Sequence, residues 1–152
     1  MSKARGICKY WLPVGLWMLV IFCASSDPLS STHTSRFLGP IVRWLAPDIS
    51  EAALDAVVFR VRKCAHLTEY AVLAWLVWRA LRKPAKQDQR RWSWSEFSIA
   101  LLVATLYGAS DEFQQMFVQT RMASGWDVLI DSCGGALGLL LLWAHGLWRK
   151  NW

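Results

Sequence analysis

The sequence predicts an all-α integral membrane protein with four transmembrane helices in a single domain, residues 1–152. Two observations predict this fold. Hydrophobic residues make up 55% of the chain and are gathered in long apolar runs, which approach the roughly 17–25 residues that cross a hydrocarbon core. Basic residues are concentrated in the short connections between these runs, which is the pattern of a membrane topology signal.

The composition also excludes some functions. A net charge of +6 could indicate nucleic-acid binding, but the position of the basic residues between apolar runs argues against it. No nucleic-acid partner is therefore predicted. The four cysteines contain no C-x-x-C spacing, so the sequence gives no support to a zinc or redox motif.

The first predicted span covers residues 10–26. It follows three basic residues and stops at Ser25-Ser26-Asp27-Pro28. A basic front, a short apolar run and small residues at the end also fit a signal peptide. A retained span is the preferred interpretation, and a cleaved signal peptide is the alternative.

The other predicted spans cover residues 63–81, 97–118 and 126–148. In the long connection before residue 63, two apolar patterns recur at helical spacing. They consist of Phe37, Leu38, Ile41, Val42 and Leu45, and of Leu54, Val57, Val58 and Val61. Pro47 ends the first pattern, and Ser50 is a predicted N-cap for the second. We expect two short amphipathic helices on the membrane surface or over the bundle.

Counting Lys and Arg predicts the orientation. Eleven lie at the two termini and in segment 79–91, and six lie in the remaining connections. Because cytoplasmic loops carry the excess of Lys and Arg, the N- and C-termini are both predicted to be cytoplasmic.

This orientation places polar residues of all four spans at one extracytoplasmic height. The first span ends there at Ser25, and the second enters there at Lys63. The third leaves through Asp111, and the fourth re-enters through Asp127. An ionised side chain deep in a bilayer costs about 2.5–3.5 kcal/mol on insertion scales. The grouping therefore indicates a functional site.

Helical geometry predicts that these residues point into the bundle. At about 100° per residue, Asp127, Asp131, Gly134 and Gly138 share one stripe. The small-xxx-small spacing of the two glycines lets a neighbouring helix approach closely. The second and third spans have similar polar faces. The face of the second consists of Lys63, His66, Glu69 and Tyr70. The face of the third consists of Tyr107, Gly108, Asp111 and Gln115, with Glu112 at its edge.

The predicted ligand-binding site is an outward-facing polar cleft. It consists of Lys63, His66, Glu69, Asp111, Glu112, Gln115, Arg121, Asp127 and Asp131. Its acids outnumber its bases even when the histidine is protonated. The surplus carboxylates must be protonated, hydrated or matched by a ligand. For any single residue, the alternative is an ion pair that only holds helices together.

The residues assembled above resemble the VanZ-like family of small bacterial membrane proteins. The matching segments are Ser25-Ser26-Asp27-Pro28, Lys63-x-x-His66-x-x-Glu69-Tyr70-Ala71-x-Leu73, and Asp111-Glu112-x-x-Gln115-x-Phe117 followed by Arg121 and Asp127-x-x-x-Asp131-x-x-Gly134-x-x-x-Gly138. Gln114 departs from the family, in which histidine is frequent at this position. The resemblance implies a cell-envelope role in the bacterial cytoplasmic (inner) membrane. It also implies a relation to glycopeptide resistance, because the family is named after a member linked to teicoplanin resistance.

The preferred function is binding of the headgroup of a lipid-linked or amphiphilic envelope molecule. Lys63 and Arg121 would contact a phosphate or carboxylate, and the acids would accept hydrogen bonds from sugar hydroxyls or an amine. Membrane lipids and a lipid-linked envelope precursor are the expected partners.

The alternative is a membrane-embedded hydrolase or transferase that acts on a lipid-linked substrate. The candidate catalytic residues are His66, Glu69, Asp111 and Glu112. No cofactor is predicted, although His66, Glu69, Asp111 and Asp131 offer ligands for a divalent cation in this alternative. An ion-conducting or purely scaffolding role ranks last, because the inner halves of the spans carry no polar relay.

Overall fold

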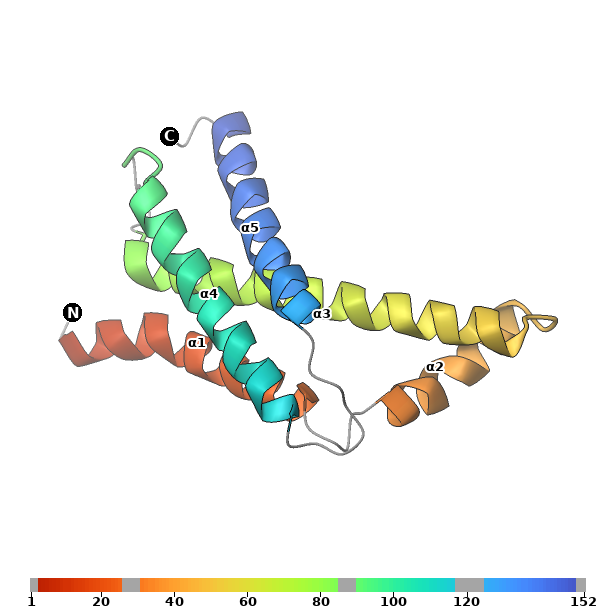
Figure 1. Ribbon diagram of the computed structural model, residues 1–152. Helices are drawn as coiled ribbons and strands as arrows, with labels where there is room; N and C mark the ends of the chain where they lie inside the picture. The colour runs from red at the N-terminus through yellow and green to blue at the C-terminus, as the bar shows by residue number, and fades with distance from the viewer. Residues whose placement is uncertain (1–2, 26–30, 85–89, 117–124, 150–152) are drawn as a thin grey trace.

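The computed structural model describes residues 3–25, 31–84, 90–116 and 125–149. These ranges contain five helices and no strand. The helices are α1 (Lys3–Ser25), α2 (Ser31–Leu45), α3 (Glu51–Arg82), α4 (Trp94–Gln115) and α5 (Gly125–Trp148) (Figure 1). The prediction of an all-α fold is confirmed.

Helix α3 is the central element. It contacts each of the other four helices, and α4 also contacts α1 and α5. In Figure 1, α1, α4 and α5 gather around the C-terminal part of α3, whereas α2 lies beside its N-terminal part. The fold is therefore a bundle of α1, α3, α4 and α5, with an arm made of α2 and residues 51–62 of α3.

The prediction of two short helices before the second span is only half right. The first of them corresponds to α2, but the second is the beginning of α3, which continues without a break from Glu51 to Arg82. Ser50 caps α3 as expected, since its side chain accepts a hydrogen bond from the Ala53 amide. No proline or glycine interrupts residues 51–82, so nothing ends the helix where the polar residues begin.

The centre of the bundle is apolar and closely packed. Leu73, Ala74 and Val77 of α3 are fully buried, together with Ala100 and Ala104 of α4 and Leu139 of α5. The outer faces of the same helices are apolar too, for example at Leu16, Leu102 and Leu141, each more than half exposed. Large exposed apolar surfaces mark a membrane or partner contact.

Two described helices are long and apolar enough to cross a membrane, α1 over Gly6–Ser25 and α5 over Gly125–Trp148. Helices α3 and α4 have sufficient length, but their apolar runs are interrupted by the polar residues of the predicted site.

One end of the bundle, here called the aromatic end, is held by a buried arginine and a group of rings. Arg82 donates to the backbone carbonyls of Arg90 and Arg91 and to the Glu96 carboxylate. The Trp78 and Trp92 rings stack at 5.5 Å. These contacts tie the end of α3 to the start of α4.

The start of α1 and the end of α5 lie at the aromatic end. The Tyr10 hydroxyl of α1 donates to the Pro84 carbonyl, 3.3 Å away. The rings of Trp94 at the start of α4 and Trp143 near the end of α5 are 5.6 Å apart. Figure 1 shows the first turn of α1 and the last turn of α5 on this side, which leaves the predicted polar residues at the opposite end.

Candidate functional site

The polar residues of α1, α3, α4 and α5 meet at the end of the bundle opposite the aromatic end. This polar end contains Ser25, Lys63, His66, Glu69, Tyr70, Gly108, Asp111, Glu112, Gln115, Asp127 and Asp131. Their spacings of three or four residues place them on one face of each helix. The structure therefore brings together the predicted site residues of three separate helices.

Asp111 ties α1 to α4. Its Oδ2 atom accepts hydrogen bonds from the Ser25 hydroxyl at 2.7 Å and from the Gln115 side-chain amide at 2.9 Å. All three side chains are buried. Ser26, Asp27 and Pro28, the rest of the predicted polar segment, lie outside the described residues.

Asp131 lies between His66 and the backbone of α4. Its Oδ1 atom is 3.5 Å from His66 Nδ1. A Cβ atom added to Gly108 would lie 3.3 Å from Asp131 Oδ2 and 3.3 Å from Tyr70 Cε1. Tyr70 and Asp131 therefore converge on Gly108, where any larger residue would push them apart.

Lys63 and Asp127 form an ion pair that joins α3 to the first turn of α5. About a quarter of each side chain is exposed, at 26% and 24%. Exposure falls to 17% at His66 and to 1% at Asp131, one helical turn further in. The polar end thus opens to its surroundings beside this ion pair and closes towards Asp131.

The remaining predicted residues lie at the edge of this cluster or outside the described chain. Glu112 is buried, and Glu69 is within electrostatic range of His66. The Glu69 backbone carbonyl accepts a 2.9 Å hydrogen bond from Trp17 Nε1 of α1. Arg121 lies outside the described residues.

Several buried polar atoms have no hydrogen-bond partner among the described residues. At the polar end they include His66 Nδ1, Asp111 Oδ1, both carboxylate oxygens of Asp131 and the Tyr70 hydroxyl. The His66–Asp131 distance is too long for a good hydrogen bond. Each unsatisfied buried group costs about 1–3 kcal/mol, and more when charged, so this cluster is costly when empty.

The burial differs from the open cleft expected from the sequence. Asp111, Glu112, Gln115 and Asp131 are each at most 5% exposed, so they lie within the helix packing. For Asp131, the reason is the close approach of α5 to α3. A Cβ atom added to Gly134 would lie 2.9 Å from Leu67 Cα, and one at Gly138 would lie 2.8 Å from Ala71 Cβ.

Two residues of the site were not chosen from the sequence, although their helical phase was visible. Tyr70 is four residues after His66, and Gly108 is three residues before Asp111. Both lie on the predicted polar faces. Neither was included in the predicted ligand-binding site, which was defined mainly by charged residues within the apolar runs.

A metal site is not supported by this geometry. Among the described residues, no group of three or more His, Cys, Asp or Glu side chains is placed to hold a metal ion. The acidic side chains lie in the same part of the bundle, but their oxygens are not arranged around one point at the 2.0–2.6 Å distances that Mg²⁺ or Ca²⁺ requires.

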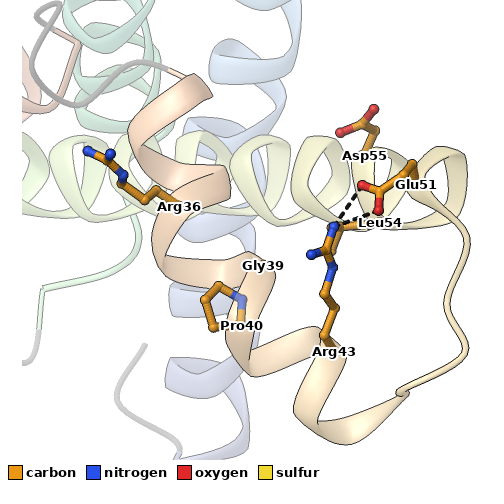
Figure 2. Close-up of a pocket in the computed structure, with 7 residues that line it drawn as sticks. All are labelled: Arg36, Gly39, Pro40, Arg43, Glu51, Leu54 and Asp55. Carbon is orange, nitrogen blue, oxygen red and sulfur yellow. Dashed lines mark hydrogen bonds and ion pairs between the residues drawn. The ribbon is translucent and has the colours of Figure 1, made fainter.

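A separate hollow of about 550 Å³ lies in the arm, between α2 and the start of α3 (Figure 2). Arg43 donates two hydrogen bonds to Glu51 there, at 2.6 and 2.8 Å, while Arg36 points away from this pair. None of the predicted site residues lines this hollow.

The sequence model of one protein family, described as VanZ/LLP1, matches residues 10–149. The chain belongs to this family. The match covers α3, α4 and α5 completely and α1 from residue 10 onwards, and the resemblance derived from the polar motifs is confirmed. No curated protein and no solved structure matches the chain. As a VanZ/LLP1 family member with long apolar helices, the chain is a membrane protein.

Proposed function

We propose that α1, α3, α4 and α5 all cross the bacterial cytoplasmic membrane, with both termini in the cytoplasm. The aromatic end carries the excess of Lys and Arg, which favours the cytoplasmic side. Its Trp residues suit the membrane–water interface. The polar end then faces outward.

Reporter fusions test this topology. A green fluorescent protein at the C-terminus should fluoresce, whereas a periplasm-dependent phosphatase at the same place should be inactive. The same phosphatase inserted in the exposed turn at residues 46–49 should be active. Opposite activities at these two positions are required, and equal activities would contradict four spans.

We further propose that the polar end binds the headgroup of a lipid-linked or amphiphilic molecule of the cell envelope. The observation that carries this proposal is the set of buried oxygens on Tyr70, Asp111 and Asp131 that have no hydrogen-bond partner within residues 3–25, 31–84, 90–116 and 125–149. A headgroup with hydrogen-bond donors would satisfy them. The exposed apolar faces of α1, α4 and α5 offer contact to the acyl or prenyl chain.

The apolar core also favours binding over conduction. Leu73, Ala74, Val77 and Leu139 fill the space between the two ends of the bundle. These side chains provide no polar relay for a proton or ion. The polar cluster is therefore better suited to hold a group at one side of the membrane than to pass ions through it.

Native mass spectrometry of the purified protein tests the binding proposal. Asp111→Asn and Glu69→Gln should each reduce the co-purified envelope lipid by about tenfold, which corresponds to about 1.4 kcal/mol of binding free energy. Asp48→Asn and Glu51→Gln are matched controls at exposed positions outside the bundle and should retain the lipid. An unchanged lipid profile in both folded site variants would refute the proposal. Teicoplanin, an amphiphile itself, is a second ligand for this assay.

Catalysis is the second candidate, because His66 faces Asp131 as a general base would face its orienting carboxylate. In this arrangement Asp131 is the orienting carboxylate, although it is not among the candidate catalytic residues chosen from the sequence. The Ser25 hydroxyl donates its hydrogen bond to Asp111, so it does not form a serine–histidine pair with His66. Turnover of a lipid-linked substrate that is lost in His66→Gln would favour the enzyme over the binding protein.

A further inference from the structure

We infer that the headgroup bound at the polar end carries a primary amine. This inference rests on the proposed headgroup binding and specifies its chemistry. It is carried by oxygen atoms of three different helices that are buried, have no hydrogen-bond partner among the described residues and belong to a cluster in which acids outnumber bases.

The unpartnered oxygens match the donors of an ammonium group. Asp111 uses Oδ2 for Ser25 and Gln115, which leaves Oδ1 unpartnered among the described residues. Asp131 and the Tyr70 hydroxyl supply further acceptors from α5 and α3. All three side chains are at least 97% buried. A primary ammonium has three N–H donors, one for each of these residues.

The local charge favours a cation. Lys63 is paired with Asp127, and His66 faces Asp131. In the described part of the chain, no cationic side chain forms an ion pair with Asp111. An anionic group would add to the charge of the buried carboxylates, whereas an ammonium would neutralise part of it.

The geometry favours an ammonium over a metal ion. A metal requires several oxygens at 2.0–2.6 Å from one point, and the described acids offer no such group. Hydrogen bonds from N⁺–H to carboxylate oxygens are longer, at about 2.7–2.9 Å, and can be made to acceptors that are further apart.

The exposure gradient also gives the headgroup a direction. The site opens beside Lys63 and Asp127 and closes at Asp131. A phosphate linked to the amine through two carbons would then remain near Lys63, about one helical turn, roughly 5.4 Å, from the inner acids. The expected ligand is therefore zwitterionic, with its amine inside and its phosphate outside.

Two phospholipids with the same net charge and the same phosphate test this inference. Phosphatidylethanolamine has three N–H donors, whereas phosphatidylcholine has a trimethylated nitrogen with none. The full-length protein is exposed to equal amounts of both, and native mass spectrometry measures the bound lipid. We expect at least a tenfold preference for phosphatidylethanolamine, and loss of this preference in Asp131→Asn.

Tyr70→Phe is a second test variant, which keeps the inference testable if Asp131→Asn does not fold. It keeps the buried ring and removes only the unpartnered hydroxyl, so the lipid-free protein should unfold at the same or a higher temperature. Its preference for phosphatidylethanolamine should nevertheless fall several-fold. Asp48→Asn, in an exposed turn, should keep the full preference.

The outcomes separate this inference from the proposed function. Equal binding of both phospholipids that still depends on Asp111 would refute the selection of a primary amine and leave the proposed headgroup binding intact. Preferential binding that persists in both Asp131→Asn and Tyr70→Phe would also overturn the inferred site. Lipid binding that does not respond to Asp111→Asn and Glu69→Gln would overturn the proposed function itself.

Discussion

Gly134→Ala is expected to prevent α5 from packing against α3 and to cause the largest loss of stability of any single methyl addition in the bundle. The new Cβ atom would meet the Leu67 carbonyl oxygen more closely than an added Cβ meets any atom at Gly138, and it would lie 2.9 Å from Leu67 Cα and 3.0 Å from the Leu67 carbonyl carbon. These are backbone atoms, so relief requires a shift of the whole of α3 relative to α5. Overpacking usually costs about 1–3 kcal/mol, and we expect a loss at or above the upper value.

Thermal unfolding of the purified protein, followed by the helical circular dichroism signal, measures this loss. Gly15→Ala is the matched control, because a Cβ atom at Gly15 meets nothing within 4 Å. Alanine there should leave stability unchanged or raise it by up to about 1 kcal/mol, as expected from helix propensity. Equal unfolding temperatures for the two variants would show that α3 and α5 are not held at the described distance.

The same contact determines how much of the site could be predicted from the sequence. Helical phase alone placed Asp131 and Gly134 on one stripe of α5, and the structure packs both against other helices. Helical phase does not determine how closely the neighbouring helix approaches. For this reason the sequence suggested an open cleft, whereas Asp131 is 1% exposed.

Pairings between distant residues were the least predictable part. Ser25 and Asp111 are 86 positions apart, and the sequence indicated only that both lie at the same height. Similarly, the sequence grouped His66 with Glu69, Asp111 and Asp131 without choosing a partner, and the structure shows that it faces Asp131. Such pairings depend on how each helix is rotated about its axis within the bundle. The polar pattern shows which face of a helix points inward, but it does not determine which residue of a neighbouring helix each side chain contacts.

The length of α3 was missed for a local reason. Hydropathy changes at Lys63, so the sequence suggested that a new span begins there. Backbone continuity is governed by helix-breaking residues and caps, and α3 has its cap at Ser50. A charged residue can thus mark a membrane boundary without marking the end of a helix.

The Lys63–Asp127 pair gives the second large effect that we expect. Lys63→Asp would place two carboxylates against each other between α3 and α5, where an ion pair now lies. Two unit charges about 4 Å apart interact by about 4 kcal/mol at an effective dielectric of about 20. Because a quarter of each side chain is exposed, screening lowers the expected loss to about 2–3 kcal/mol.

Exchanging both charges tests whether these residues act as a pair. Lys63→Asp/Asp127→Lys should recover most of the lost unfolding temperature. Recovery should be incomplete, since Asp127 lies in the first turn of α5, where a lysine loses about 0.3–1 kcal/mol in the helix dipole. The same exchange at Arg43 and Glu51, whose side chains are 53% and 77% exposed, should change stability by less than about 1 kcal/mol.

The double variant also bears on how a ligand would enter. If the Lys63–Asp127 ion pair is strong, an incoming phosphate must compete with Asp127 for the ammonium of Lys63. Ligand binding should then weaken the contact between α3 and α5 at the polar end. A double variant as unstable as Lys63→Asp alone would mean that the two charges contribute independently. Lys63 would then be available to a phosphate without any change in the packing of α5.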